Sequence, residues 1–327
     1  MSTLIRQYWK NGRGFVLGLA VGVSGSAAFV FQKKYLMGPP PSHKALRYGS
    51  PETSKLRYFT NFVCEVDYSS KNPIWVAEHI PCQNIESKAS RKGVHYKEDE
   101  NIDERFRALL SQYRGSGYDR GHMSPAANNK SDAIAMKESF YLSNCCPQVG
   151  KGFNQDYWAR FERFILEMRP QCENIYVVTG PLYLPKKTSE KEEGVRPLGA
   201  SWHVEYGLLE SPTGNLLAIP THFYKVILAE LKNDSLGGQS RHALGAFVMP
   251  NAQIHPKTPL ESFSVPVAQL EQAAGIKFFP KFFDNINRSG KTPLLEGRVR
   301  PDEEKKYLHI CDVTQGCAIP KEDFWKK

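Results

Sequence analysis

The chain has 327 residues, of which 41% are hydrophobic and 24% are charged, enough apolar material for a large folded core. This composition excludes a fully disordered chain, a collagen-like or coiled-coil fibre, and a membrane protein with many spans. The formal net charge is +9, but residues 1–51 hold seven basic residues and no acidic one, which leaves 36 basic and 34 acidic residues in the remainder. The net charge alone therefore does not predict nucleic-acid binding.

Residues 14–31 form an uncharged, apolar run with basic residues on both sides. As a helix, this run is ~27 Å long, close to the thickness of the hydrocarbon core of a bilayer. Basic, acid-free flanks are typical of a mitochondrial presequence that also anchors in the inner membrane. The alternative is a secretory signal peptide, although Ser26-Ala27-Ala28 matches a cleavage site poorly. We expect residues 1–34 to be a mitochondrial targeting and membrane-anchor segment.

The next segment, residues 35–55, contains Gly38-Pro39-Pro40-Pro41-Ser42, which favours a stiff, extended linker. The folded domain is expected at 56–327, because no second linker and no long internal repeat interrupts it. Alternating or continuous apolar residues predict strands at 62–68 and 74–77, which form a hairpin, and at 140–142, 175–179, 202–209, 223–228 and 246–249. These elements predict one mixed α+β domain.

Helical spacing of apolar residues predicts two helices. The first covers 103–114 and stops before Gly115, and the second is an amphipathic helix over 153–168. The charged tract 186–194 is expected to be a surface loop.

Seven cysteines, with no Cys-x-x-Cys pair, argue against a dense disulfide framework. His309, Cys311 and Cys317 resemble a fragment of a zinc site, but a fourth ligand is missing and the spacing is wrong. We therefore expect the cysteines to be free, buried thiols.

The chemistry is concentrated in the segment Gly117–Ala126, which contains Asp119-Arg120-Gly121-His122. In an extended strand, Arg120 and His122 share one face, while Asp119 and Gly121 lie on the other. An imidazole can accept a proton from water near neutral pH, and a guanidinium can hold a phosphate through two oxygens. Most histidines have no catalytic role, so the neighbours of His122 carry the argument. Asp119 is expected to support the turn or to pair with a base.

Downstream, the predicted strand at 140–142 delivers Asn144, and the predicted helix carries Asn154 and Glu162. Each residue has an ordinary explanation. Asn154 is a common helix cap, and Glu162 can be a solvated or ion-paired helix residue.

Together these motifs resemble the sugar-non-specific DNA/RNA nucleases of the ββα-metal fold, and in particular the mitochondrial endonuclease G branch with its fungal members. The resemblance rests on Asp119-Arg120-Gly121-His122, then Asn144, then Phe153-Asn154 with Trp158, and Phe161-Glu162. It covers about 56–280, and it extends to the Arg91-Lys92 segment, to 179–185 and to 219–223. It implies an α+β fold with a mixed, mainly antiparallel sheet and flanking helices.

The resemblance also implies a role for each site residue. His122 is the general base, and Asn154 is the one direct protein ligand of a Mg²⁺ ion, for which Mn²⁺ substitutes. Glu162 holds water molecules of that ion. Such a site suits Mg²⁺, which keeps most of its water ligands. Arg91 and Arg120 lie near the scissile phosphate, and Asn144 orients His122 or the substrate.

The implied activity is hydrolysis of DNA and RNA phosphodiesters with little base selectivity, leaving 5′-phosphate and 3′-hydroxyl ends. Binding that depends on phosphate contacts weakens steeply with salt. The implied assembly is a homodimer, and the implied location is the mitochondrial inner membrane facing the intermembrane space.

Three alternatives remain open at this point. One is an exonuclease-biased enzyme of the same family. Another is a membrane-tethered nucleic-acid-binding protein without catalysis, which does not need Asn154. The third is a thiol hydrolase built from Cys145 or Cys146 with His122.

Overall fold

The computed structural model describes residues 51–83, 88–187, 202–232, 242–288, 307–314 and 316–320. The chain divides into two compact units at Glu52 and Thr53, and the second unit, Thr53–Lys327, contains almost all described residues. The expected membrane anchor, residues 1–34, lies outside the described residues, as does most of the expected linker. Among the helices that are described, none is both long and apolar enough to cross a membrane.

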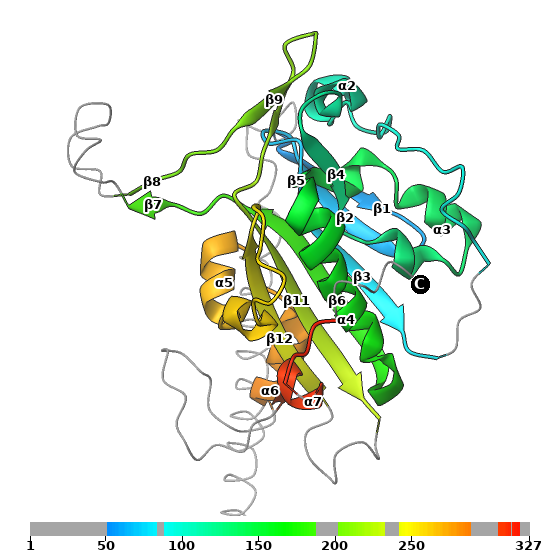
Figure 1. Ribbon diagram of the computed structural model, residues 1–327, viewed down its shortest axis with the longest axis vertical. Coiled ribbons are helices and arrows are strands. Elements are labelled where there is room, and N and C mark those ends of the chain that lie inside the picture. The colour runs from blue at the N-terminus through cyan, green and yellow to red at the C-terminus, as the bar shows by residue number, and fades with distance from the viewer. Residues whose placement is uncertain are drawn as a thin grey trace, which may run out of the picture. The chain divides into compact units, whose positions relative to one another are not determined.

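A seven-stranded sheet forms the centre of the described part of the second unit (Figure 1). Its strands lie in the spatial order β1 (Ser54–Tyr58), β2 (Phe62–Asp67), β3 (Pro73–Pro81), β6 (Cys172–Leu182), β11 (His222–Leu231), β12 (His242–Pro250) and β13 (Leu308–His309). Neighbouring strands are antiparallel except for β12 and β13, which are parallel. The predicted hairpin is confirmed as β2 and β3, and the strands predicted within β6, β11 and β12 are confirmed as well.

The motif segment forms a separate two-stranded ribbon, in which β4 (Tyr118–His122) pairs with β5 (Cys145–Val149). A helical segment, Gly150–Trp158, follows β5 directly and continues into α4 (Ala159–Glu167). Gly152 interrupts the first turn of this segment with a φ of +78°, a backbone conformation that glycine adopts readily. The predicted amphipathic helix, 153–168, is therefore present and begins directly after this interruption.

Shorter elements complete the described part of the unit. The helices are α2 (Leu110–Tyr113), α3 (Ala133–Glu138), α5 (Val267–Ala274), α6 (Pro280–Arg288) and α7 (Ile310–Val313), with 3₁₀ turns at Glu104–Phe106, Ala126–Asn129, Leu142–Asn144, Arg169–Gln171 and Leu260–Phe263. Two small antiparallel pairs join β7 (Lys186–Lys187) to β8 (Trp202–His203) and β9 (Leu208–Glu210) to β10 (Leu216–Ala218).

Side chains of the large sheet alternate between two apolar cores. In β11, Phe223 and Ile227 pack in the core that also contains Trp158 and Phe161 of the helical segment and α4. The intervening residues of β11, such as Tyr224, pack on the opposite face in a core that includes residues of α5. Helices therefore cover both faces of the sheet, and the α4 face is the one that meets the motif ribbon (Figure 1).

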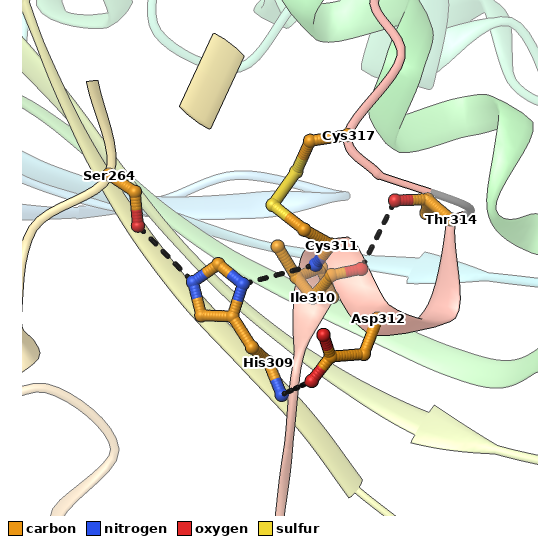
Figure 2. The surroundings of a disulfide bond; sticks show 7 residues. All are labelled: Ser264, His309, Ile310, Cys311, Asp312, Thr314 and Cys317. Carbon is orange, nitrogen blue, oxygen red and sulfur yellow. Dashed lines mark hydrogen bonds between the residues drawn. A yellow bond between two sulfur atoms is a disulfide. The ribbon is translucent and has the colours of Figure 1, made fainter. Parts of the chain in front are cut away.

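Cys311 and Cys317 form a disulfide, so the expectation of free thiols was wrong for this pair (Figure 2). Gly316, at a φ of +90°, donates its backbone N–H to Cys311 O, and this tight return brings Cys317 back against α7. His309 is engaged in local hydrogen bonds with Ser264 and the Cys311 N–H, so it does not complete a zinc site. The other five cysteines are free, as expected: Cys64, Cys82, Cys145, Cys146 and Cys172.

Three predicted elements differ from the structure. Residues 140–142 contribute only an isolated bridge, Tyr141 with Lys97, and the strand that follows is β5. The predicted helix at 103–114 is two short pieces, Glu104–Phe106 and α2. The predicted strand at 202–209 is likewise two pieces, because 204–207 pair with no strand. In 103–114 and 140–142, buried side chains such as Leu109, Tyr113, Phe140 and Leu142 pack in the core, although their backbone does not form the continuous helix or strand that was predicted. In 202–209, by contrast, the large apolar side chains at 202, 204, 206 and 208 are exposed.

Candidate active site

The motif ribbon places Arg120 and His122 on one face of β4. Both lie against Tyr96: the guanidinium carbon of Arg120 is 4.4 Å from the ring centroid, and the imidazole centroid is 5.3 Å from it. Asp119 lies on the other face, where its carboxylate accepts hydrogen bonds from the helical segment. The alternation expected from an extended strand is therefore confirmed.

Gly121 is required by close packing across the ribbon. A Cβ atom at this position would lie 1.8 Å from Oε1 of Gln148, which is far inside any permitted contact. Gln148 is fully buried, and neither of its side-chain polar atoms has a hydrogen-bond partner among the described residues. The glycine of the motif thus leaves the space that the Gln148 side chain fills.

Two aromatic rings gather the basic side chains around His122. The rings of His122 and Phe140 are edge to face, with centroids 4.8 Å apart, and the Arg91 guanidinium carbon is 5.5 Å from the Phe140 centroid. Tyr96 donates a hydrogen bond of 3.0 Å to Arg120 O. Cation–π contacts therefore hold both arginines beside the imidazole, so the structure brings Arg91, Arg120 and His122 together.

The environment of His122 favours its neutral form. Burial, followed by the positive charges of Arg91 and Arg120, lowers the pKa of His122 to about 3. Its Nδ1 lies 3.5 Å from Tyr96 Oη, and its buried Nε2 has no hydrogen-bond partner among the described residues. A neutral imidazole can accept a proton, as a general base must.

Asn154 is tied to the strand that carries His122. Its amide nitrogen donates a hydrogen bond of 2.8 Å to Oδ2 of Asp119, and Gln155 donates to the same oxygen. Because a carboxylate only accepts, the amide nitrogen must face Asp119, and Oδ1 of Asn154 stays outside this bond. The side chain does not cap the helical segment, so helix capping does not explain this asparagine.

Asp119 precedes His122 by three residues of extended strand, a separation of roughly 10 Å. No direct contact between Asn154 and His122 occurs among the described residues, so the two groups are linked through Asp119 and β4. The carboxylate of Asp119 accepts hydrogen bonds from the side-chain amides of Asn154 and Gln155. These amides take the place of the basic side chain with which Asp119 was expected to pair.

Glu162 lies in α4, which continues the helical segment, about two turns beyond Asn154, and it is half-buried. Burial raises the pKa of Glu162 to about 7, against the opposing effect of the Lys225 charge. Glu162 is therefore not a fully solvated surface residue, which was one of the two non-catalytic explanations for a glutamate on this helix.

The residues present fit a hydrated Mg²⁺ ion better than a metal enclosed by protein ligands. Across the described ranges, no group of three or more His, Cys, Asp and Glu side chains could hold a metal. An amide oxygen at Asn154 with a carboxylate at Glu162 is a hard, oxygen-only donor set. Mg²⁺ prefers such donors and usually keeps several water ligands.

Asn144 has a different place from the one expected. It is fully buried, its Oδ1 accepts from the Ser124 N–H, and its Nδ2 donates to the carbonyls of Ser124 and Ser139. These hydrogen bonds fix the backbone just after His122. The described contacts of the Asn144 side chain do not include His122, so it supports the strand end and does not orient the imidazole directly.

The sequence matches the family described as DNA/RNA non-specific endonuclease over residues 41–285. The chain belongs to this family of nucleic-acid hydrolases. Relatives extend over most of its length. It is 40% identical to the mitochondrial nuclease of Saccharomyces cerevisiae, over 72% of this chain and 69% of that one. It is also 40% identical to nuclease 1, mitochondrial, of Schizosaccharomyces pombe, over 83% and 80% of the two chains.

A solved structure gives the same answer for the fold. A chain in the crystal structure of an EndoG/EndoGI complex superposes with a TM-score of 0.61 at 36% identity, covering 74% of this chain and 93% of that one. This endonuclease therefore has the α+β, ββα-metal nuclease fold.

The thiol-hydrolase alternative has no support in the environment of its cysteines. Cys145 lies opposite His122 in the ribbon, and Cys146 lies opposite Gly121. Burial raises the pKa of both thiols far above the ordinary range. A thiol nucleophile reacts as the thiolate, so these buried thiols are poorly suited to attack.

Four residues at this endonuclease site were not singled out from the sequence: Tyr96, Phe140, Gln148 and Lys225. Phe140 was assigned only to a predicted strand and Tyr96 to no element, and nothing in the sequence indicates which rings pack on the arginines. Lys225 did carry a signal, because it occupies an inward-facing position in an otherwise apolar strand.

Proposed function

We propose that this nuclease is a Mg²⁺-dependent enzyme, active also with Mn²⁺, that cleaves DNA and RNA internally without preference for the sugar. The observation that carries the proposal is the bond from Asn154 to Asp119, because it joins a metal-binding amide to the strand that holds Arg120 and His122. Asp119 and His122 are separated by roughly 10 Å along β4, so this bond fixes Asn154 to the strand that carries the base.

Each side chain then has a defined task. Arg91 and Arg120 bind oxygens of the scissile phosphate. The neutral His122 accepts the proton of the attacking water molecule. Asn154 is the direct metal ligand, and Glu162 accepts hydrogen bonds from metal-bound water. The metal ion supplies fixed positive charge that stabilises the charge developing on the phosphate and on the departing oxygen. In-line attack that expels the 3′ oxygen leaves 5′-phosphate and 3′-hydroxyl ends.

Substrate binding would change the charge beside the base. Burial is the larger cause of the low pKa of His122, and the charges of Arg91 and Arg120 add to it. A bound phosphate offsets these charges, which moves the pKa of His122 upward, in the direction of the pH at which the enzyme works. A base is most effective when its pKa lies near that pH.

We also propose a mitochondrial location. Relatives at 40% identity are named as mitochondrial nucleases, and residues 1–34 have the composition of a targeting and inner-membrane anchor segment. In this proposal residues 35–55 are a linker, 56–327 form a homodimeric nuclease domain in the intermembrane space, and the membrane separates the enzyme from nuclear DNA. Fractionation of cells that express the tagged full-length chain tests the location, and a cytosolic signal contradicts it.

The function is tested by digestion of closed circular plasmid DNA and of RNA with Mg²⁺, with and without a chelator. We predict cleavage of both substrates that stops when the chelator is added. Because a closed circle has no ends, its relaxation requires an internal cut and rejects a strict exonuclease. His122→Ala and Asn154→Ala are each expected to lower turnover by at least ~10² while DNA binding persists.

Two matched variants control for general damage. His79→Ala removes an exposed histidine on β3, and Gln155→Ala removes the other amide that binds Asp119. Both should keep turnover within about threefold of wild type. Wild-type turnover in His122→Ala would reject the assignment of the base. Wild-type turnover in Asn154→Ala would reject its assignment as the metal ligand. A wild-type chain that binds DNA but shows no turnover would favour the non-catalytic nucleic-acid-binding protein.

A further inference from the structure

Lys225 is a buried cation in the core beside the candidate active site. It lies in β11 between Phe223 and Ile227, on the face of the sheet that packs against α4, and only 1% of it is exposed. An apolar residue at this position would extend the core without the desolvation penalty of a buried charge. A buried ammonium is retained only if other groups satisfy it, so its contacts indicate what it does.

Those contacts join both halves of the site. Lys225 Nζ donates a hydrogen bond of 3.3 Å to Met123 O, in the residue that directly follows His122. It donates a second bond, of 2.8 Å, to Thr179 Oγ1 in β6. It also lies 4.8 Å from the ring centroid of Trp158, which is itself buried.

Trp158 occupies the middle of the segment that holds the metal-binding residues. It follows Asn154 by four residues and precedes Glu162 by four, which places the three on neighbouring turns of one helical stretch. One ammonium group therefore touches the strand end that fixes His122 and the helical stretch that presents Asn154 and Glu162.

The carboxylates on which the charge of Lys225 acts also come from both halves of the site. Its positive charge acts on two carboxylates, Glu78 and Glu162, and opposes the increase in pKa that burial causes in each. Glu78 in turn accepts hydrogen bonds from Ser124 and Asn128, in the loop that follows His122. The charge of Lys225 thus acts both on a carboxylate that is bonded to the loop after the base and on a carboxylate of the helix that would hold the metal.

We propose that Lys225 is a positioning residue that holds the His122 strand and the Asn154–Glu162 helical stretch at the separation that one metal ion and one phosphate require. The proposal rests on the proposed function. In this role Lys225 touches neither substrate nor metal. Loss of Lys225 should lower both metal affinity and turnover. Loss of a residue that only stabilises the fold should lower neither in the molecules that remain folded.

The test is Lys225→Met, which keeps the length of the side chain and removes its charge and its donors. Mg²⁺ binding is measured by calorimetry and Mn²⁺ binding by electron paramagnetic resonance, beside plasmid turnover and thermal unfolding. We expect metal affinity and turnover each to fall by about tenfold or more, which is typical when a group that supports metal ligands is lost. Lys225→Arg, which keeps the charge and the donors, should retain more of both.

Two further variants separate positioning from stability. Glu78→Gln with Lys225→Met removes one of the two carboxylates that the single variant leaves without a cation, so the melting temperature should recover in part while metal affinity and turnover stay low. Lys232→Met removes another lysine bond to a carbonyl, that of Pro170, at an exposed place. It should leave metal affinity and turnover unchanged.

The outcomes distinguish the two proposals. If the wild type shows no Mg²⁺-dependent cleavage, the proposed function fails. If the wild type cleaves, but Lys225→Met or the double variant binds metal and turns over like wild type, Lys225 is only a core residue and the present inference is overturned. Loss of metal affinity in folded Lys225→Met, with partial recovery in Lys225→Arg, supports it.

Discussion

A neutral imidazole between two arginines is the central chemical feature of the site at the scale of residues. Burial lowers the pKa of His122 most, and the charges of Arg91 and Arg120 lower it further. In the proposed function, the arginines also bind the phosphate, so substrate offsets the second of these two causes. Substrate binding and the basicity of His122 would then depend partly on the same charges.

The low pKa of His122 leads to a direct prediction. In the free enzyme, the imidazole of His122 should stay neutral between pH 8 and pH 5, so its nuclear magnetic resonance signals should not move across a range in which an ordinary histidine, with a pKa near 6.5, takes up a proton. Arg91→Ala removes one charge that lowers the pKa, so the pKa should rise and titration should move into or toward this range. A wild-type midpoint near 6.5 would contradict the environment described for His122.

The motif residues could be found from the sequence because their chemistry is rare and their spacing is fixed. His122, Arg120 and Asn154 are linked by one strand and one helical stretch, and both follow from local patterns. Asn144 shows the limit of such reasoning. Its position was identified, but the three backbone hydrogen bonds that occupy its amide depend on how a loop closes, which no spacing specifies.

The ribbon β4–β5 is the element that gives the site its geometry. The Gln148 side chain lies directly over Gly121, so the two strands approach each other closely beside His122. The side chain of Gln148 makes no hydrogen bond to any described residue, so the volume that it fills is what matters here.

This packing predicts a suppressor. Gly121→Ala should destabilise the protein by about 1–3 kcal/mol, as overpacking typically does, and should lower turnover by displacing His122. Adding Gln148→Ala to it removes the clashing atoms and should recover most of the stability and turnover. Denaturant unfolding and plasmid cleavage measure the two effects. If the double variant were no better than Gly121→Ala, crowding across the ribbon would not be the reason for the glycine.

Elements with strong periodicity were predicted well, and weak ones were not. The helix that contains α4 was predicted, and so were β2, β3, β6, β11 and β12 of the large sheet, from apolar patterns of four to seven residues. The edge strands β1 and β13 were not predicted. At 140–142 and 103–114, apolar residues pack on other elements without forming the regular structure that their spacing suggests. The disulfide at Cys311 was missed because the tight return at Gly316 leaves no pattern in the sequence.

At the scale of the whole molecule, the chain is basic but its nuclease domain is not. Beyond residue 51 the basic and acidic residues nearly balance, at 36 and 34. A domain with almost no net charge does not attract nucleic acid through long-range electrostatics. Affinity must come from local groups, of which Arg91 and Arg120 are the ones that the structure gathers beside His122.

The salt dependence of DNA binding should reveal this local origin. Each phosphate contact contributes about −0.9 to the slope of log K against log salt concentration on duplex DNA. Arg91→Ala and Arg120→Ala should each make the slope less negative by about that amount. Arg105→Ala is the control, because Arg105 is exposed and paired with Asp103. Unchanged slopes in both site variants would mean that other groups hold the phosphates.

The edge strand β13 has a consequence for biosynthesis. Its two residues, Leu308 and His309, pair with Ala243 and Leu244 of β12, across an interval of more than sixty positions along the chain. Because a ribosome makes the polypeptide from its N-terminus, Ala243 and Leu244 cannot gain these partners until residues 308 and 309 have been made. A message truncated before codon 308 would leave this part of the β12 edge open, and open edges are prone to aggregate. The pairing of β13 is therefore expected to follow the pairing of β11 with β12 during synthesis.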